Sequence, residues 1–196
     1  MKRTLFSFVV LLISVSVTAA RTGTGDGDSS PFETAFAAGG DLRMNLCSSG
    51  VVVRGSDDNQ IRVRYSGRDD GGDVKVKFKS NGNRGELEIS HCPRNNFQIT
   101  IDIPRVTDLR VRMFAGQLEV EQITGNKDLE IDAGQLTVAI GKAEDYGQVD
   151  GSVTTGQVDA SPFNVSKGGL FRSFHQSGPG KYKLHAHVGA GQVDLN

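Results

Sequence analysis

Apolar and polar residues alternate along most of the chain after residue 40. The clearest alternating segments are 42–46, 61–65, 74–78, 87–89, 97–103, 109–113, 129–131 and 184–188. A period of two over a few residues, bounded by Gly, Asn, Asp or Pro, is typical of strands with one buried face. Only 33–38 and the residues near 143 could be helical, and neither sustains a helical period. The sequence therefore predicts an all-β protein.

A short unit repeats through the second half of the chain. Its copies are FAGQLEV (114–120), DAGQLTV (132–138), DYGQVDG (145–151), TTGQVDA (154–160) and GAGQVDL (189–195). The flank before the first copy also recurs, since DLRVRMFAGQLEV (108–120) matches DLEIDAGQLTV (128–138) and echoes DLRMNLCSSGVVV (41–53). The unit is a strand, a turn at Gly and a second strand, and its uneven spacing predicts coils of unequal length.

The glycine of each copy is expected at a corner of the chain. Glycine permits a positive φ and a close backbone approach that a Cβ would prevent. Gly116, Gly134 and Gly156 should then lie along one edge of a parallel stack, with the Leu or Val two places later inside. The Gln residues at 117, 135, 148, 157 and 192 either stack in a hydrogen-bonded ladder or are solvated turn residues.

The segment IPRVTDLRVRMFAGQLEVEQITGNKDLEIDAGQLTV (103–138) resembles the bacterial "putative-adhesin" domain family, whose members are described as auto-transporter-adhesin-head-like or as domains of unknown function. The resemblance covers most of the chain after residue 40. It implies an irregular, single-stranded, right-handed β-solenoid of Gly-cornered repeats, exported or associated with the cell surface. The family's motifs specify a fold and supply no catalytic or binding residues.

The first 20 residues have the three parts of a secretory signal peptide. Lys2 and Arg3 are followed by an apolar run and then by the small residues Thr18, Ala19 and Ala20, with cleavage expected after Ala19 or Ala20. An uncleaved N-terminal anchor is the alternative. Residues 21–30 form a Gly/Ser/Thr/Asp linker, and 31–196 form the β domain. We expect the mature chain to be periplasmic, cell-surface or extracellular, with no transmembrane segment.

The charge balance argues against a nucleic-acid-binding protein. Without Lys2 and Arg3 the chain has 20 basic and 23 acidic residues, a net charge of about −3. Nucleic-acid binding usually requires a markedly basic domain.

Two cysteines, Cys47 and Cys92, follow the predicted leader. Each stands one place beyond an alternating run, so they can face each other if their strands are neighbours. An oxidising compartment and an even count favour a disulfide, and two buried thiols are the alternative.

No motif indicates catalysis, a cofactor or a metal site. His185 and His187 share one strand face, with His175 as a conceivable third ligand, but solvated histidines explain the pattern without a metal. Asp150 and Asp159 follow the same Gly-Gln-Val core and would lie side by side if those cores stack. Such outward carboxylates more often face solvent than act as an acid–base pair.

Basic residues gather in the first half, on the outward parity of three predicted strands. They are Arg62, Arg64, Lys75, Lys77, Arg110 and Arg112. If the strands adjoin, they form an electropositive face for anionic cell-surface polysaccharide. Alternatively, they keep exposed strands from pairing edge to edge.

These observations favour a non-enzymatic exported protein that acts through its surface as an adhesive, binding or scaffolding module. Its expected partners are an anionic cell-surface polysaccharide or another envelope protein. A polysaccharide-modifying enzyme on a β-helix, or a purely structural envelope partner, is the alternative.

Overall fold

The computed structural model describes residues 32–67, 74–93 and 96–196, and these residues are almost entirely β-structure, as predicted. The first seven strands are β1 (Phe32–Ala35), β2 (Gly40–Leu46), β3 (Ser49–Ser56), β4 (Gln60–Gly67), β5 (Lys75–Asn81), β6 (Arg84–Ser90) and β7 (Phe97–Pro104). The remaining elements are β8 (Thr107–Glu121), β9 (Lys127–Val138), β10 (Tyr146–Ala160), β11 (Val165–Ser177), β12 (Tyr182–Leu195) and the 3-10 turns η1 (Ala143–Asp145) and η2 (Ser161–Phe163).

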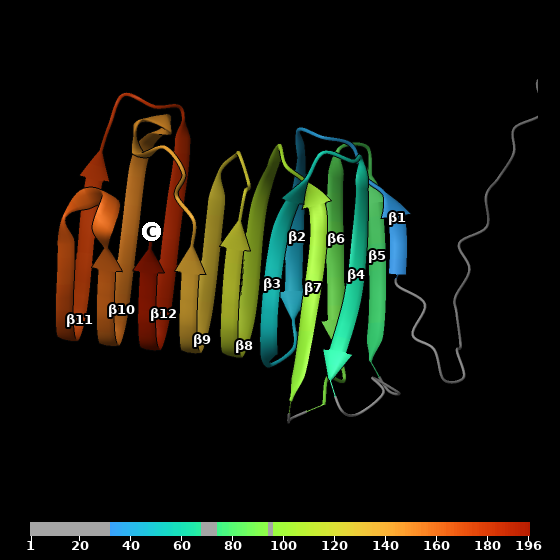
Figure 1. Cartoon of the computed structure of the whole chain (residues 1–196), viewed down its shortest axis with the longest axis horizontal. Helices are drawn as coiled ribbons and strands as arrows, with labels where there is room; N and C mark the ends of the chain where they lie inside the picture. Colours follow the sequence, from blue (N-terminus) through green and yellow to red (C-terminus); the bar gives the residue numbers. More distant parts are fainter. Residues whose placement is uncertain (1–31, 68–73, 94–95) are drawn as a thin grey trace, which may run out of the picture.

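Each long strand contributes to two layers, because it bends at its middle. In β8 the buried side chains are Leu109, Val111 and Met113 before the bend and Leu118 and Val120 after it, so both arms turn an apolar face to one interior. The bends follow one edge of the molecule, the lower edge in Figure 1. The first layer contains β5, β6, β2 and the first arms of β8, β9, β12 and β10, whereas the second contains β4, β7, β3 and their second arms.

The strands form one mixed, open sheet that folds over on itself. Its order is β1-β4-β7-β3-β8-β9-β12-β10-β11, with β2 beside β8, β6 beside β2 and β5 beside β6. Neighbours from β3 to β10 run parallel, whereas β1, β4, β5 and β11 pair antiparallel.

The all-β class is therefore confirmed, but a single-stranded right-handed solenoid is not shown. In a simple solenoid the coils stack in chain order, whereas here β12 lies between β9 and β10 (Figure 1). The physical reason is that the Gly-Gln copies are nearly interchangeable neighbours, so the repeat pattern does not fix their order.

In four of the five Gly-Gln copies the glycine lies at a bend, as predicted. Gly147 is not at a bend: it lies at the start of β10, where the neighbouring strand supplies Tyr182 and Lys183. The similar segment at 41–53 pairs with 108–120 in one continuous register, which places Ser49 opposite Gly116. Ser49, and not Gly50, therefore occupies the bend position of that copy.

Aromatic and charged side chains close the two ends of the interior. Phe163 packs on Phe174 at the β11 end, and Phe36 meets Phe78 edge-on at the other. Lys167 of β11 is paired with buried Val158, an inward position that most strands fill with an aliphatic residue. A charge there discourages the addition of a further strand.

The predicted signal peptide (1–20) and linker (21–30) lie outside the described residues. Within 32–67, 74–93 and 96–196, no helix has the length and apolar content that crossing a membrane requires.

Candidate functional site

The bend glycines stand in register on adjacent strands. Gly116 pairs with Gly134, Gly134 with Gly191, and Gly191 with Gly156, and all four have φ between +128° and +142°. A Cβ on Gly134 would overlap the carbonyl oxygen of Gly116, and the other pairs repeat this contact. The predicted edge of stacked glycines is confirmed, with the Leu or Val two places later buried.

A row of carboxamides runs beside these glycines on the outside of the second layer. In successive register positions this bend row consists of Gln98, Gly50, Gln117, Gln135, Gln192 and Gln157, and Gly50 is its one member without a side chain. Neighbouring members are about 4.8 Å apart, the spacing of strands in a sheet. Gln148 lies outside the row, and Gln98 joins it although no Gly-Gln copy marks it.

A hydrogen-bonded glutamine ladder is not seen among the described residues. Gln157 instead donates from Nε2 to the carboxylate of Asp159, 2.6 Å away. The row is therefore a series of aligned amides without a hydrogen bond between glutamines of the described residues.

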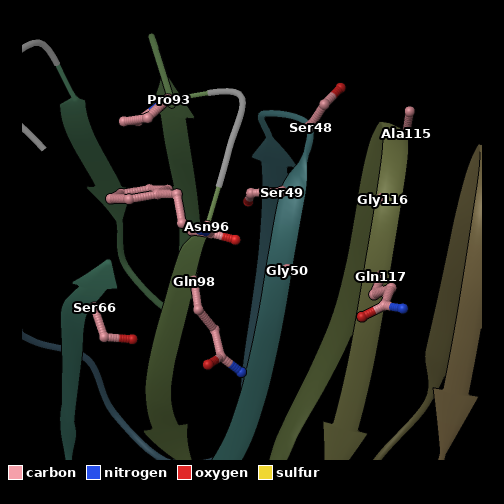
Figure 2. A pocket seen from close by; sticks show the side chains of 11 residues that line it. Ser48, Ser49, Gly50, Ser66, Pro93, Asn96, Gln98, Ala115, Gly116 and Gln117 are labelled. Atoms are coloured by element: carbon pink, nitrogen blue, oxygen red, sulfur yellow. The ribbon is translucent and has the colours of Figure 1, made fainter. Parts of the chain in front are cut away.

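A hollow of about 680 Å³ opens where the bend row lacks a side chain. Figure 2 shows Gln98 and Gln117 on the strands either side of Gly50, with Ser66 beyond Gln98. Ser49 also lines the hollow, and its buried Oγ has no hydrogen-bond partner among the described residues.

Two phenylalanines project into solvent along the bend. Phe114 on β8 is 71% exposed and Phe171 on β11 is 79% exposed. The flanking register pairs place both at the same step of the bend, four strands apart, or about 19 Å at 4.8 Å per strand. Phe171 has φ +50°, an unfavourable conformation for a bulky residue, and such strain often marks a functional position.

The outside of the first layer carries two rows of charged and polar residues. One contains Lys79, Glu86, Arg43, Arg110, Asp128, His185, Asp150 and His175, and the other contains Lys77, Glu88, Asn45, Arg112, Glu130, His187, Ser152 and Ser173. Opposite charges often face each other across strands, which stabilises the sheet modestly.

The six basic residues of the predicted anion-binding face are divided between the layers. Arg62 and Arg64 lie on β4 in the second layer, whereas Lys75, Lys77, Arg110 and Arg112 lie on β5 and β8 in the first. Five have an acidic partner within 4.0 Å: Arg62 with Glu33 and Asp58, Arg64 with Asp102, Lys77 with Glu88, Arg110 with Asp128, and Arg112 with Asp128 and Glu130. The expected single cluster of six free cations does not form.

Asp150 and Asp159 do not lie side by side, contrary to the expectation from their matching motifs. Asp150 is in the first layer, 2.6 Å from Nδ1 of His175, whereas Asp159 is in the second layer, bonded to Gln157 and Ser166. Burial opposes ionisation of Asp150, but hydrogen bonds from His175 and Gln148 hold its pKa below the usual range. The pair therefore lacks the shared geometry of an acid–base couple.

Cys47 and Cys92 form a disulfide with a Cα–Cα distance of 5.9 Å. The bond joins the residue after β2 to the residues after β6, and those strands are neighbours. It therefore links the segments that follow β2 and β6, next to the hollow.

Two buried charged groups, Asp102 and Lys127, escaped the sequence analysis. Lys127 is 2% exposed in the inward row between Leu109 and Leu184. Its Nζ donates to the carbonyl of Gly125 at 3.3 Å and to the hydroxyl of Tyr146 at 2.7 Å. Burial lowers the pKa of Lys127 to about 8 and, with nearby charges, raises the pKa of Tyr146 to about 12. The alternation of 127–131 was the signal that Lys127 points inward.

No family model matches the chain, and no curated protein matches its sequence. Among solved structures, it is similar to a protein from Clostridium sporogenes described as a "putative cell adhesion protein", at 14% identity and a TM-score of 0.54, covering 85% of this chain and 98% of that one. A protein from Parabacteroides distasonis described as a "putative lipid binding protein" aligns at 7% identity with a TM-score of 0.25, too low to carry an argument. The first likeness shows a shared all-β fold.

Proposed function

We propose that this chain is an exported, non-enzymatic adhesive module whose bend row binds an extended cell-surface polysaccharide. The observation that carries the proposal is the alignment of four glutamines on adjacent strands beside two solvent-exposed phenylalanines. The signal-peptide pattern at residues 1–20 and the disulfide support export. The parallel stacking of β8, β9, β12 and β10 supplies the repeated spacing that such binding needs.

The chemistry of the bend row suits hydroxyl groups. A carboxamide offers two N–H donors and one carbonyl acceptor, so it can pair with hydroxyls in either direction. Amides repeated at about 4.8 Å can meet successive units of a linear polymer. The exposed rings of Phe114 and Phe171 offer apolar surfaces against which the CH faces of sugar rings can pack.

The charges near the bend favour a neutral segment of polysaccharide over a strongly acidic one. Glu119 and Asp159 lie on the same outer face as the row, two positions beyond Gln117 and Gln157. The basic residues that could attract an anionic polymer are mostly paired with acids. An acidic polymer therefore binds elsewhere or weakly, a departure from the anionic partner expected from sequence.

The direct test is binding of the mature chain to immobilised envelope polysaccharides, measured by biolayer interferometry with Phe114→Ser and with Gln135→Ala/Gln192→Ala. Val106→Ser is the matched control, because Val106 is also an exposed apolar residue, at 47%, but it directly precedes β8, at the end of that strand's first arm away from the bend. Each bend variant should weaken binding at least about tenfold, the effect of about 1.4 kcal/mol, and the control should not.

A Gly50→Gln variant tests whether the ligand binds to the bend row or in the hollow. A Cβ at Gly50 meets Gln98 at 3.8 Å and the carbonyl oxygen of Phe97 at 3.9 Å, both ordinary contacts, so the variant should fold normally while filling the hollow and continuing the amides. Retained or stronger binding supports the row. Polysaccharide binding that ignores all these variants, or capture of an envelope protein through the bend with no polysaccharide binding, would refute the proposal.

The enzymatic alternative is a polysaccharide-modifying activity on the same scaffold. It predicts new reducing ends or unsaturated products when the mature chain is incubated with the polysaccharide that it binds. We expect none, since the Asp150–Asp159 pair that motivated this alternative is split between the layers.

A further inference from the structure

We propose that Asp128, Glu130 and His185 form a zinc-type divalent metal site on the outer face of the first layer. The three residues lie on adjacent strands: Asp128 and Glu130 are on β9, and His185 on β12 is paired with Asp128. One ligand atom from each can be chosen so that all three lie within 4.8 Å of one another. This site is independent of the bend row and of the proposed function.

The distance between the side chains of His185 and Glu130 suits a shared metal ion. His185 Nε2 lies 3.9 Å from Glu130 Oε1, too far for a hydrogen bond. Two ligands of one tetrahedral zinc ion, each at about 2.0–2.1 Å, are about 3.4 Å apart, so these two side chains need to approach by only about half an ångström. Within the described part of the chain, neither atom has a hydrogen-bond partner.

Arg112 contacts both carboxylates: it donates to Oδ1 and Oδ2 of Asp128 at 3.2 and 3.1 Å, and Oδ2 also accepts from Arg110 at 3.0 Å. It contacts Glu130 through Oε2 at 3.0 Å, which leaves Oε1 directed at His185. Burial opposes ionisation of Asp128, but Arg112, Arg110 and His185 together hold its pKa below the usual range. Arg112 is therefore a positioning residue: it holds both carboxylates, while Oδ1 of Asp128 keeps a second acceptor site for the ion, as hydrogen-bonded carboxylates around metal sites do.

The ligand set selects the class of metal. One imidazole and two carboxylates suit Zn²⁺ and its neighbours Co²⁺, Ni²⁺ and Cu²⁺, whereas Ca²⁺ and Mg²⁺ prefer oxygen ligands alone. The site is partly exposed, so water can complete the coordination. His187, the next outward residue of β12, is held by Ser152 at 2.8 Å through Nδ1 and is left out of the ligand set.

The test uses the tag-free mature chain with its disulfide intact, titrated with Zn²⁺ by calorimetry and with Co²⁺ by visible absorption. We expect one site per chain, no heat with Mg²⁺ or Ca²⁺ and weaker binding at pH 5, because a protonated imidazole cannot ligate. His185→Ala and Glu130→Gln should each weaken Zn²⁺ binding at least about tenfold. Circular dichroism checks that each variant is folded.

His175→Ala is the matched control, because His175 is also an outward histidine of the first layer beside a carboxylate. Its Zn²⁺ affinity should equal that of the unaltered chain. Equal losses in the His175 and His185 variants, or unchanged affinity in His185→Ala and Glu130→Gln, would overturn the assignment. Polysaccharide binding is measured in parallel, and its loss alone would leave the metal site intact.

Discussion

The Nζ of Lys127 lies 2.7 Å from the hydroxyl of Tyr146, inside a row that Leu109 and Leu184 fill on the neighbouring strands. No carboxylate of the described residues lies within ion-pair distance of this amine, so two neutral oxygens are its hydrogen-bond partners. Burying a cation in this way costs stability.

The stability of the protein should therefore rise with pH between about 8 and 10.5. In this window the unfolded lysine still holds its proton, whereas the folded lysine, with its pKa at about 8, has released it. The unfolded state then binds more protons, so the free energy of unfolding increases with pH. The gain is at most about 3 kcal/mol, and urea denaturation at pH 7, 8.5 and 9.5 measures it. Above pH 10 the raised pKa of Tyr146 acts in the opposite direction.

Lys127→Met tests the assignment to this residue. Methionine should remove the rise between pH 7 and 9.5 and raise stability at pH 7 by about 1 kcal/mol, since the unpaired Tyr146 hydroxyl offsets part of the gain. A variant that keeps the pH dependence of the unaltered chain would assign it to another group.

Gly134→Ala should destabilise the protein by about 2–4 kcal/mol. The added Cβ would overlap the carbonyl of Gly116 and hold alanine at φ +136°, so strain and steric overlap act together. Gly141→Ala is the control, because Gly141 has φ +70° with no atom within 4 Å of the added Cβ. It should lose only about 1 kcal/mol. Equal losses in thermal or urea unfolding would mean that close strand approach does not matter at the bend.

Ser49→Ala should leave stability unchanged or raise it by up to about 1 kcal/mol, because the buried Oγ has no partner to lose. Ser56→Ala is the matched control, since its hydroxyl donates to the carbonyl of Ile103 at 3.2 Å. That variant should lose about 1 kcal/mol. A larger loss in Ser49→Ala than in Ser56→Ala, measured by urea unfolding, would show that the Ser49 hydroxyl is satisfied.

Thiol titration of the denatured protein should detect no free thiol, as Cys47 and Cys92 are joined. Replacing both with alanine should reduce the free energy of unfolding by about 2–4 kcal/mol, because the bond closes a loop with a sequence separation of 45 residues. Two titratable thiols in the native preparation would contradict the pairing.

Phe171→Gly should stabilise the protein by about 1 kcal/mol while weakening polysaccharide binding. Glycine adopts φ +50° without strain, and the phenyl ring is 79% exposed, so little packing is lost. Phe114→Gly is the contrast, since Phe114 is not among the residues with positive φ and should gain no stability. A loss of stability in Phe171→Gly would assign the ring a packing role.

The sequence by itself determined the local structure. In strands such as β2 and the first arm of β8, alternation identified the buried residues, because successive side chains of a strand point to opposite faces. The Gly-Gln unit located the bends at Gly116, Gly134 and Gly156, because few other residues tolerate their backbone conformation and close approach.

Only the tertiary structure decided which strands are neighbours. In the folded chain β12 lies between β9 and β10, and His185 lies beside Glu130. Asp150 and Asp159 lie in different layers, as do the basic residues of the predicted anion-binding face. The physical reason is that nearly identical bends can stack in several orders with similar local energy. The order then depends on packing across the whole interior, and residues far apart in sequence become partners only there.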